Sequence, residues 1–389
     1  MVKRLTVSRA LPDPGLSAPG ACTGEGEAAL AGGRWVKWIG GASNQDLASI
    51  EDLAGLYSLA GAHCLDLAAD EAVVAAARRG MAWAESRGAS RPWLMVSLSD
   101  GADPHFRKAW FDPRRCPPQC PRPCERVCPA QAIAPAPSAT GVLSDRCYGC
   151  GRCLPACPHG LIEERDQLLP DAAVPALLRS LRPDAIELHT RIGRSAPFAA
   201  RLAQVRAAAL PLQRLAVSCG LEVDEAPAAP VAAGEASAPR PARPEARAER
   251  LAAEFWERFA QLRGAGLQPL WQLDGRPMSG DVGAGTARSA VQLLVRVART
   301  MPPGPLQLAG GTNDATLALV EGLGEPLAPL VAGVAFGSVA RVRLQELLAQ
   351  AQARGGRLLD QPDLLEPALD LAVALVEPWL RRRRRARRR

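Results

Sequence analysis

Eight of the 11 cysteines in this chain lie in two blocks between residues 116 and 157, and each block ends in Cys-Pro. The second block follows the spacing C-x2-C-x2-C-x3-C-P, with Cys147, Cys150, Cys153 and Cys157. The first block keeps the C-x3-C-P ending but has three residues in each earlier gap, with Cys116, Cys120, Cys124 and Cys128. The spacing of the second block is that of the cysteine runs that bind iron–sulfur clusters in bacterial ferredoxins.

A run of this kind wraps one peptide around three irons of a cluster, and its last cysteine ligates the other cluster when two are present. The spacing therefore predicts two [4Fe–4S] clusters that exchange their last ligands. One ligand set is Cys116, Cys120, Cys124 and Cys157, and the other is Cys147, Cys150, Cys153 and Cys128. The longer gaps of the first block also admit a [3Fe–4S] cluster there.

Structural zinc and disulfide bonds are the two alternatives for these cysteines. Zinc sites favour paired C-x2-C knuckles and show no preference for a trailing proline. Disulfide frameworks belong to small secreted domains, and the first residues lack the apolar stretch of a signal peptide. The sequence also has no run of apolar residues long enough to span a bilayer. We therefore expect reduced thiolates in a cytoplasmic protein without a membrane span.

Short apolar segments alternate with amphipathic ones over most of the chain, which predicts an α/β fold. The expected strands are residues 35–40, 63–68, 93–98, 185–189, 214–219, 269–273, 306–309 and 331–336. Eight strands, each followed by a helix or an insertion, predict a (β/α)8 barrel-like domain. The cysteine blocks follow the third strand, so we expect a two-cluster ferredoxin-like unit inserted at the catalytic face of the barrel.

Composition divides the remaining chain into segments with different expectations. The segments are a disordered start at 1–33, the first part of the barrel at 34–102, the ferredoxin-like insertion at 103–165, the remainder of the barrel at 166–355 with an Ala/Pro linker at 222–247, a C-terminal helix at 356–380 and a poly-Arg tail at 381–389. The formal net charge of +7 comes from that tail, which holds eight arginines. No aromatic residue lies among the arginines for base stacking. We therefore expect a solvated tail and no nucleic-acid partner.

Two short glycine-containing turns follow the seventh and eighth expected strands, at residues 310–313 and 337–338. Barrels often bind phosphate at these loops, and the pattern resembles flavin-binding barrels. Flavin mononucleotide (FMN) is therefore a second candidate cofactor, although glycine also permits tight turns without any ligand. His189 and Asp274 lie at the expected barrel mouth without a visible catalytic partner. The sequence predicts no catalytic residue.

The first cysteine block is followed by a second block of regular spacing. The sequence of the first block is Cys-Pro-Pro-Gln-Cys-Pro-Arg-Pro-Cys-Glu-Arg-Val-Cys-Pro. With the segments at 40–44 and 310–314, these blocks resemble the cyanobacterial light-dependent period A (LdpA) family over about residues 34–355. The resemblance implies an iron–sulfur redox sensor that conveys light-driven metabolic state to the circadian clock. It implies Kai-type clock proteins and the input kinase CikA as partners, with an electron donor or the quinone-linked redox pool beside them. The resemblance implies that all eight cysteines of the two blocks are cluster ligands, and it implies no catalytic residue.

The competing interpretation is a flavin-dependent barrel oxidoreductase whose inserted clusters relay electrons. Radical S-adenosylmethionine chemistry is disfavoured, because it uses the spacing C-x3-C-x2-C and no triplet of cysteines here has it.

Overall fold

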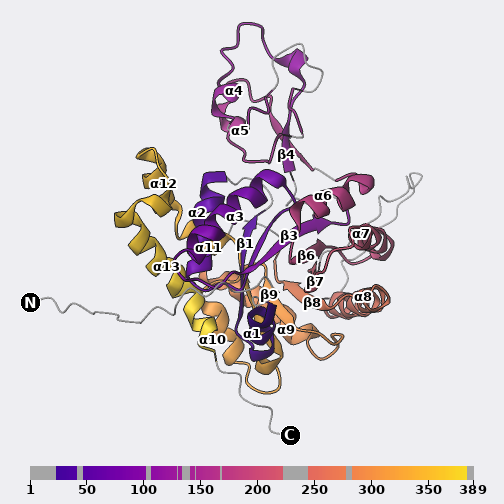
Figure 1. Ribbon diagram of the computed structural model, residues 1–389. Helices are drawn as coiled ribbons and strands as arrows, with labels where there is room; N and C mark the ends of the chain where they lie inside the picture. Colours follow the sequence, from indigo (N-terminus) through magenta and orange to yellow (C-terminus); the bar gives the residue numbers. More distant parts are fainter. Residues whose placement is uncertain are drawn as a thin grey trace, which may run out of the picture.

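The computed structural model describes residues 23–41, 47–101, 107–128, 130–133, 141–144, 146–166, 169–221, 244–276 and 283–382. Eight parallel strands close into a barrel in the order β1-β10-β9-β8-β7-β6-β3-β2 (Figure 1). Their bounds are β1 Trp35–Gly41, β2 Cys64–Ala68, β3 Trp93–Ser99, β6 Ala185–His189, β7 Arg214–Cys219, β8 Pro269–Asp274, β9 Leu306–Ala309 and β10 Val331–Phe336. The predicted (β/α)8 barrel is confirmed, and each expected strand is present.

Helices follow the strands and surround the barrel, as short parallel strands buried on both faces require. These helices are α2 Leu47–Leu59, α3 Glu71–Glu85, α6 Val174–Leu181, α7 Ser195–Ala207, α8 Pro244–Gly264, α9 Ala287–Val297, α10 Ala315–Glu321, α11 Ser338–Val342, α12 Gln345–Ala353 and α13 Pro362–Leu380. Helix α13 packs against α2 and β1 and buries Ala368, Ala372 and Trp379. The segment 356–380, expected as a separate C-terminal helix, is therefore part of the barrel's outer layer.

The structure moves three of the segment boundaries that the sequence suggested. Residues 23–32, expected to be disordered, form helix α1 (Thr23–Gly32), because Ala29 and Leu30 are buried against the floor of the barrel. The expected linker at 222–247 is shorter, because α8 already begins at Pro244. Arg382, expected in the solvated tail, is buried and donates to the carbonyl oxygen of Val331 at 2.7 Å. Residues 1–22, 222–243 and 383–389 lie outside the described residues.

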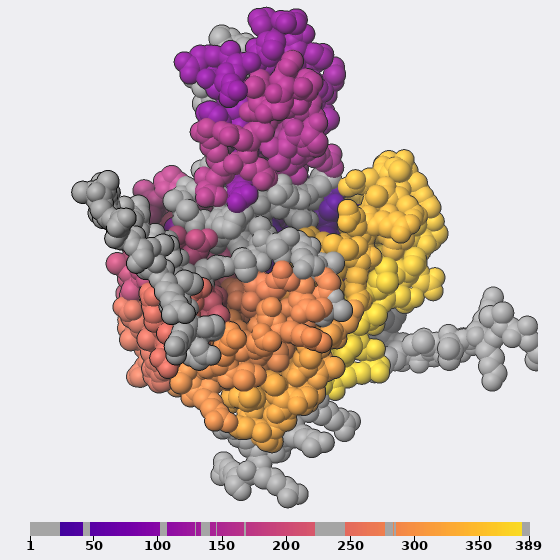
Figure 2. Space-filling model, turned by 180° about the vertical axis from the view of Figure 1, so that it is seen from behind, coloured from indigo at the N-terminus to yellow at the C-terminus, as the bar shows by residue number. Residues whose placement is uncertain are grey.

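The insertion after β3 is a small module that projects from one end of the barrel (Figure 1). Its base is an antiparallel pair, β4 (Arg107–Trp110) with β5 (Glu163–Asp166), in which Trp110 lies opposite Glu163. Two short helices, α4 (Pro123–Val127) and α5 (Cys153–Ala156), pack together above this pair. Figure 2 shows the module projecting from one end of the barrel, with the C-terminal helices rising toward its base on one side.

The module and the barrel have separate hydrophobic cores that meet at one place. The module core holds Phe111, Ile133, Val142 and Ile162 together with buried cysteines. Tyr148, which stands between two cysteines of the second block, packs instead with the barrel core. The segment 147–150 contacts the barrel core together with Ala130, which follows the first cysteine block.

Candidate metal centre

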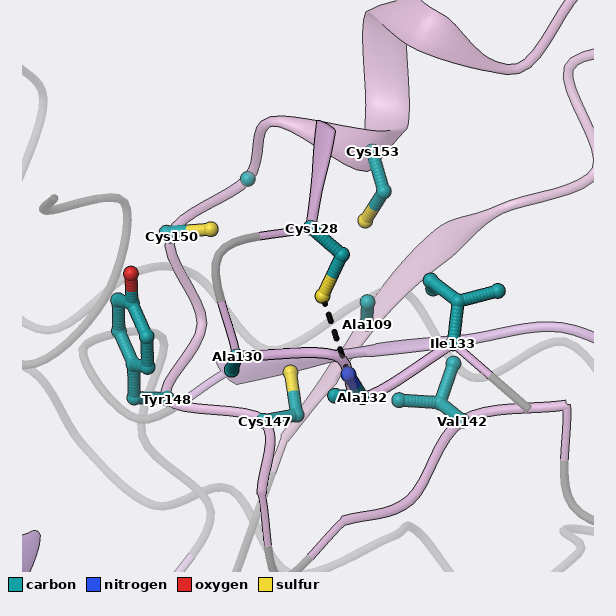
Figure 3. Close-up of a pocket in the computed structure, with 11 residues that line it drawn as sticks. Ala109, Cys128, Ala130, Ala132, Ile133, Val142, Cys147, Tyr148, Cys150 and Cys153 are labelled. Atoms are coloured by element: carbon teal, nitrogen blue, oxygen red, sulfur yellow. Dashed lines mark hydrogen bonds between the residues drawn. The ribbon is translucent and has the colours of Figure 1, made fainter. Parts of the chain in front are cut away.

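Four cysteines of the module line one pocket, with their sulfur atoms pointing toward the same space (Figure 3). They are Cys128, Cys147, Cys150 and Cys153. Three of these begin the second block, and Cys128 ends the first block. The pocket therefore gathers the ligand set expected from the exchange of last cysteines between two clusters.

The other four block cysteines form a second group. Cys116 interacts with Cys120 and lies near Cys157. Cys124 lies near Cys116 and Cys157. Thus Cys157, the last cysteine of the second block, lies with the first three of the first block. The fold brings together both predicted sets, and iron ligation by each cysteine stays a prediction.

Backbone geometry explains how such a short peptide turns around a cluster. Gly149 and Gly151 both have positive φ, 77° and 75°, which glycine adopts without steric cost. These two glycines let the chain turn within the short segment between Cys147 and Cys153. The amide contacts to sulfur come from the turns that follow Cys128 and Cys157. The N–H of Ala132 donates to Cys128 Sγ at 3.2 Å (Figure 3), and that of Leu161 donates to Cys157 Sγ at 3.4 Å. Such N–H···S bonds are among the features that set the potential of a bound cluster.

The thiols lie in apolar surroundings, which affects their protonation. Burial raises the pKa of Cys124 and Cys150, and it raises that of Cys153 to about 12. Cys157 differs, because burial acts to raise its pKa but backbone N–H groups, among them that of Leu161, outweigh it and leave the pKa below its usual value. The positive charge of bound iron favours the thiolate in both environments, since metal coordination deprotonates a thiol.

The donor set fits an iron–sulfur cluster on chemical grounds. All cysteines in the parts of the chain that the structure describes are free thiols. Among those same residues, no three His, Cys, Asp or Glu side chains converge on a single-ion site. A cubane takes one thiolate on each of its four irons, so its ligands surround the cluster instead of meeting at one ion. Zinc would require four ligands within about 2.3 Å of one point.

The barrel interior carries a charged network that sequence reasoning missed. Lys37 of β1, Asp66 of β2 and Glu187 of β6 are almost completely buried, with exposures of 0%, 2% and 1%. Each interrupts an otherwise apolar strand at an inward-facing position. The signal in the sequence was one charged residue on the inward face of each of these strands, because side chains alternate between the two faces of a strand, and it does not identify the partner.

The Lys37 ammonium lies between two carboxylates. Its Nζ donates to Asp66 Oδ2 at 2.7 Å and also to Glu187. Ser97 Oγ donates to the other oxygen of Asp66 at 2.6 Å. Burial opposes charge on both carboxyl groups. It raises the pKa of Asp66, whereas Lys37 outweighs it at Glu187 and lowers that pKa to about 2.

Glutamines and the residues at the mouth extend this network to further strands. Gln272 Nε2 donates to Glu187 Oε1 at 2.9 Å, and Gln307 Nε2 donates to Gln272 Oε1 at 2.5 Å. His189 Nε2 lies 3.0 Å from Glu187 Oε1. Asp274 Oδ2 accepts from Ser218 Oγ at 2.5 Å. His189 and Asp274, which the sequence placed at the mouth without partners, therefore lie at the upper end of this network.

Gly310 and Gly311, which the sequence suggested for binding a flavin phosphate, are closely packed against neighbouring backbone. A Cβ on Gly310 would lie 2.7 Å from the carbonyl oxygen of Arg276, and one on Gly311 would lie 2.9 Å from that of Thr286. Neighbouring protein loops thus occupy the space beside both residues. FMN binding stays a prediction that these two glycines do not support.

No helix among the described segments is both long enough and apolar enough to cross a membrane. Comparison with known families gives two matches. Residues 116–168 match the LdpA Fe-S cluster-binding domain, and residues 177–378 match the light dependent period A C-terminal domain. The curated protein named light dependent period A from Synechococcus elongatus is 46% identical over 356 residues, which cover 90% of this chain and 92% of that protein.

Solved structures similar to this chain are barrel enzymes at low identity. Tryptophan synthase from Mycobacterium tuberculosis has a TM-score of 0.40 and 13% identity, covering 93% of this chain and 98% of that chain. Morphinone reductase has a TM-score of 0.35 and 13% identity, covering 85% and 90%. At these scores the likeness carries no argument about activity.

Proposed function

This chain belongs to the light dependent period A family, and on that premise we propose that it is an iron–sulfur protein that senses cellular redox state and conveys it to the circadian clock. The observation that carries the proposal is the sorting of eight cysteines into two groups of four, in a module that contacts the barrel through its cysteine loop. The groups hold two clusters, each [4Fe–4S], with [3Fe–4S] as the alternative for the one that Cys116, Cys120, Cys124 and Cys157 bind.

Reduction changes the charge of a cluster by one unit. The first cluster lies close to the surface of the module, so a partner bound there can respond to this charge. Cys116 and Cys120 are only partly buried. A partner that binds one redox form better than the other shifts its equilibrium with the redox state. The partners are clock proteins, of the Kai type or the input kinase CikA. Electrons come from a cytoplasmic donor or from the quinone-linked pool.

The test is the affinity for such a clock partner, measured anaerobically with oxidised protein and with dithionite-reduced protein. We expect the two dissociation constants to differ. The matched control is Cys116→Ala, which removes a predicted ligand of the first cluster and should diminish the difference. Equal affinities in both redox states would refute the sensing mechanism, even if both clusters are present.

The second candidate function is a flavin-dependent barrel oxidoreductase with an iron–sulfur electron relay. The observation that favours it is the buried network of Lys37, Asp66 and Glu187, because charged groups that interact below a barrel mouth are typical of active sites. A visible spectrum separates the two functions. Bound flavin adds twin bands to the broad iron–sulfur absorption and is released by acid precipitation, whereas a sensor without flavin shows the broad absorption alone.

A further inference from the structure

A cleft of about 440 Å³ lies between the cysteine loop of the module and the helices of the barrel. Its walls come from α2, from the loop that carries Cys150 and Arg152, and from α11 and α12. Small-molecule sites are clefts of about 300–1,000 Å³ with an apolar lining and a few convergent polar groups. This cleft has that size, and a predicted cluster ligand forms part of its wall.

The polar lining of the cleft is cationic. Arg341 donates from Nη1 to the carbonyl oxygen of Ile39 at 3.0 Å and from Nη2 to Ser338 Oγ at 3.3 Å. A guanidinium has five N–H donors, so these two bonds leave donor capacity. Within the described part of the chain no carboxylate pairs with Arg341. Arg152, on the cysteine loop, adds a second positive charge to the cleft.

The rest of the lining is apolar or uncharged. Leu53 and Leu348 are buried side chains that form an apolar wall, and Gln345 adds an amide. None of the cleft's lining residues is an aspartate or a glutamate. Arginine binds planar anionic groups such as phosphate and carboxylate through paired N–H donors. The lining therefore suits a molecule with an anionic end and an apolar part.

We propose that this cleft binds a small organic anion, a phosphate or carboxylate attached to an apolar group, and that the anion binds more tightly when the cluster held by the Cys150 group is oxidised. The inference rests on the proposed iron–sulfur function. One electron from a low-potential donor enters the cluster, no bond forms or breaks, and the added negative charge lies beside Cys150. Repulsion between this charge and the anion weakens binding to the reduced form.

The coupling is reciprocal, because both equilibria share one thermodynamic cycle. An anion that prefers the oxidised protein lowers the midpoint potential of that cluster. We expect a difference of about tenfold between the two dissociation constants, which corresponds to a shift of about 59 mV for a one-electron couple. Salt weakens the effect, since added ions screen exposed charges beyond about 10 Å at 0.1 M.

The experiment is calorimetric titration of the intact, cluster-loaded protein under anaerobic conditions. The probes are adenosine diphosphate and 1-naphthoate, which separate a phosphate from a carboxylate, and adenosine is the uncharged control. We expect at least one anionic probe to bind in the oxidised state about tenfold more tightly than in the reduced state. Absence of binding by both anions at millimolar concentration, or equal affinity in both states, overturns the proposal.

Two variants test the position of the site. Arg341→Met should weaken binding at least tenfold, and Arg152→Met, at an exposed position on the cysteine loop, should weaken it as well. Arg343→Met is the matched control, because Arg343 pairs with Asp314 and does not line the cleft. An effect of Arg343→Met as large as that of the other two would place the anion elsewhere. Iron and sulfide analysis of the same samples distinguishes failure of the proposed function from failure of this inference. Protein without iron refutes the proposed function. Iron-loaded protein that binds no anion refutes this inference alone.

Discussion

Cys128 and Cys153 belong to different cysteine blocks, yet their side chains line the same pocket of the module. The last cysteine of the first block therefore lies with the first three cysteines of the second block. This exchange ties the two halves of the module together, because neither group of four is complete within one stretch of chain.

The exchange predicts which cluster each cysteine supports. Cys128→Ala should remove or convert the cluster of Cys147, Cys150 and Cys153, and leave the cluster of the first block. Cys157→Ala should have the opposite effect, although it lies in the second block. Electron paramagnetic resonance of the reduced and oxidised variants, with iron counted per chain, distinguishes the two signals. The control is Cys219→Ala, since Cys219 lies in strand β7 of the barrel and not in the module. If each substitution abolishes the cluster of its own block, the exchange is wrong.

Removal of iron should unfold the module and leave the barrel folded. The module core is small and is built partly from cysteines, among them Cys124, Cys147 and Cys153. The barrel core is separate and far larger. Metal binding supplies folding free energy where ligands are gathered from a small domain. We expect chelator-treated protein to lose amide protection between residues 107 and 166 in hydrogen exchange, whereas strands β6 to β9 stay protected. Equal loss of protection in both regions would contradict separate folding.

The strands of the barrel could be predicted because most are short apolar runs bounded by turn residues, as in β10, whose residues are all apolar and buried. Helix α1 could not be predicted, because its ten residues are mostly Gly, Ala and Glu and show no apolar periodicity. Its position depends on Trp93, which is distant in sequence and lies close enough to Gly26 that a Cβ there would be 2.6 Å from the indole ring.

The cysteine grouping could be anticipated because ligand spacing reflects the local chemistry of a cluster. The charged barrel interior could not, since a lone lysine or glutamate within an apolar strand gives no indication of its partner. Lys37 and Glu187 meet only when the barrel closes, because β2 and β3 lie between β1 and β6 in the sheet and the two side chains meet across the interior.

Replacement of Lys37 with methionine should destabilise the barrel strongly. The substitution leaves Asp66 and Glu187 buried without a counterion, and breaking a buried ion pair from one side costs about 3–5 kcal/mol. Urea unfolding followed by tryptophan fluorescence measures the free energy of unfolding. The triple variant Lys37→Met/Asp66→Asn/Glu187→Gln removes both charges as well and should recover a large part of the loss. A single variant as stable as the parent would mean that the ammonium does not balance these carboxylates.

His63 at the floor of the barrel should make stability depend on pH in the acid range. Burial lowers its pKa from 6.5 to about 4, and the neutral ring accepts a hydrogen bond from the Val36 N–H at 3.1 Å through Nδ1. The unfolded chain takes up a proton on His63 as the pH falls through 6.5, whereas the folded protein resists protonation until about 4. The contribution of neutral His63 to the free energy of unfolding is therefore complete above pH 6.5 and is lost as the pH falls from 6.5 to 4. The total loss is on the order of 3 kcal/mol.

His63→Asn retains an acceptor for the Val36 N–H and removes the titrating ring. Urea titration from pH 4 to pH 7.5 measures the free energy of unfolding of parent and variant. As the pH falls, the parent should lose stability relative to the variant. His159→Asn is the matched control, because it makes the same substitution at an exposed position on the module, away from the floor of the barrel. A pH-independent difference for His63→Asn would show that the folded protein protonates His63 at the same pH as the unfolded chain, so that burial does not lower its pKa.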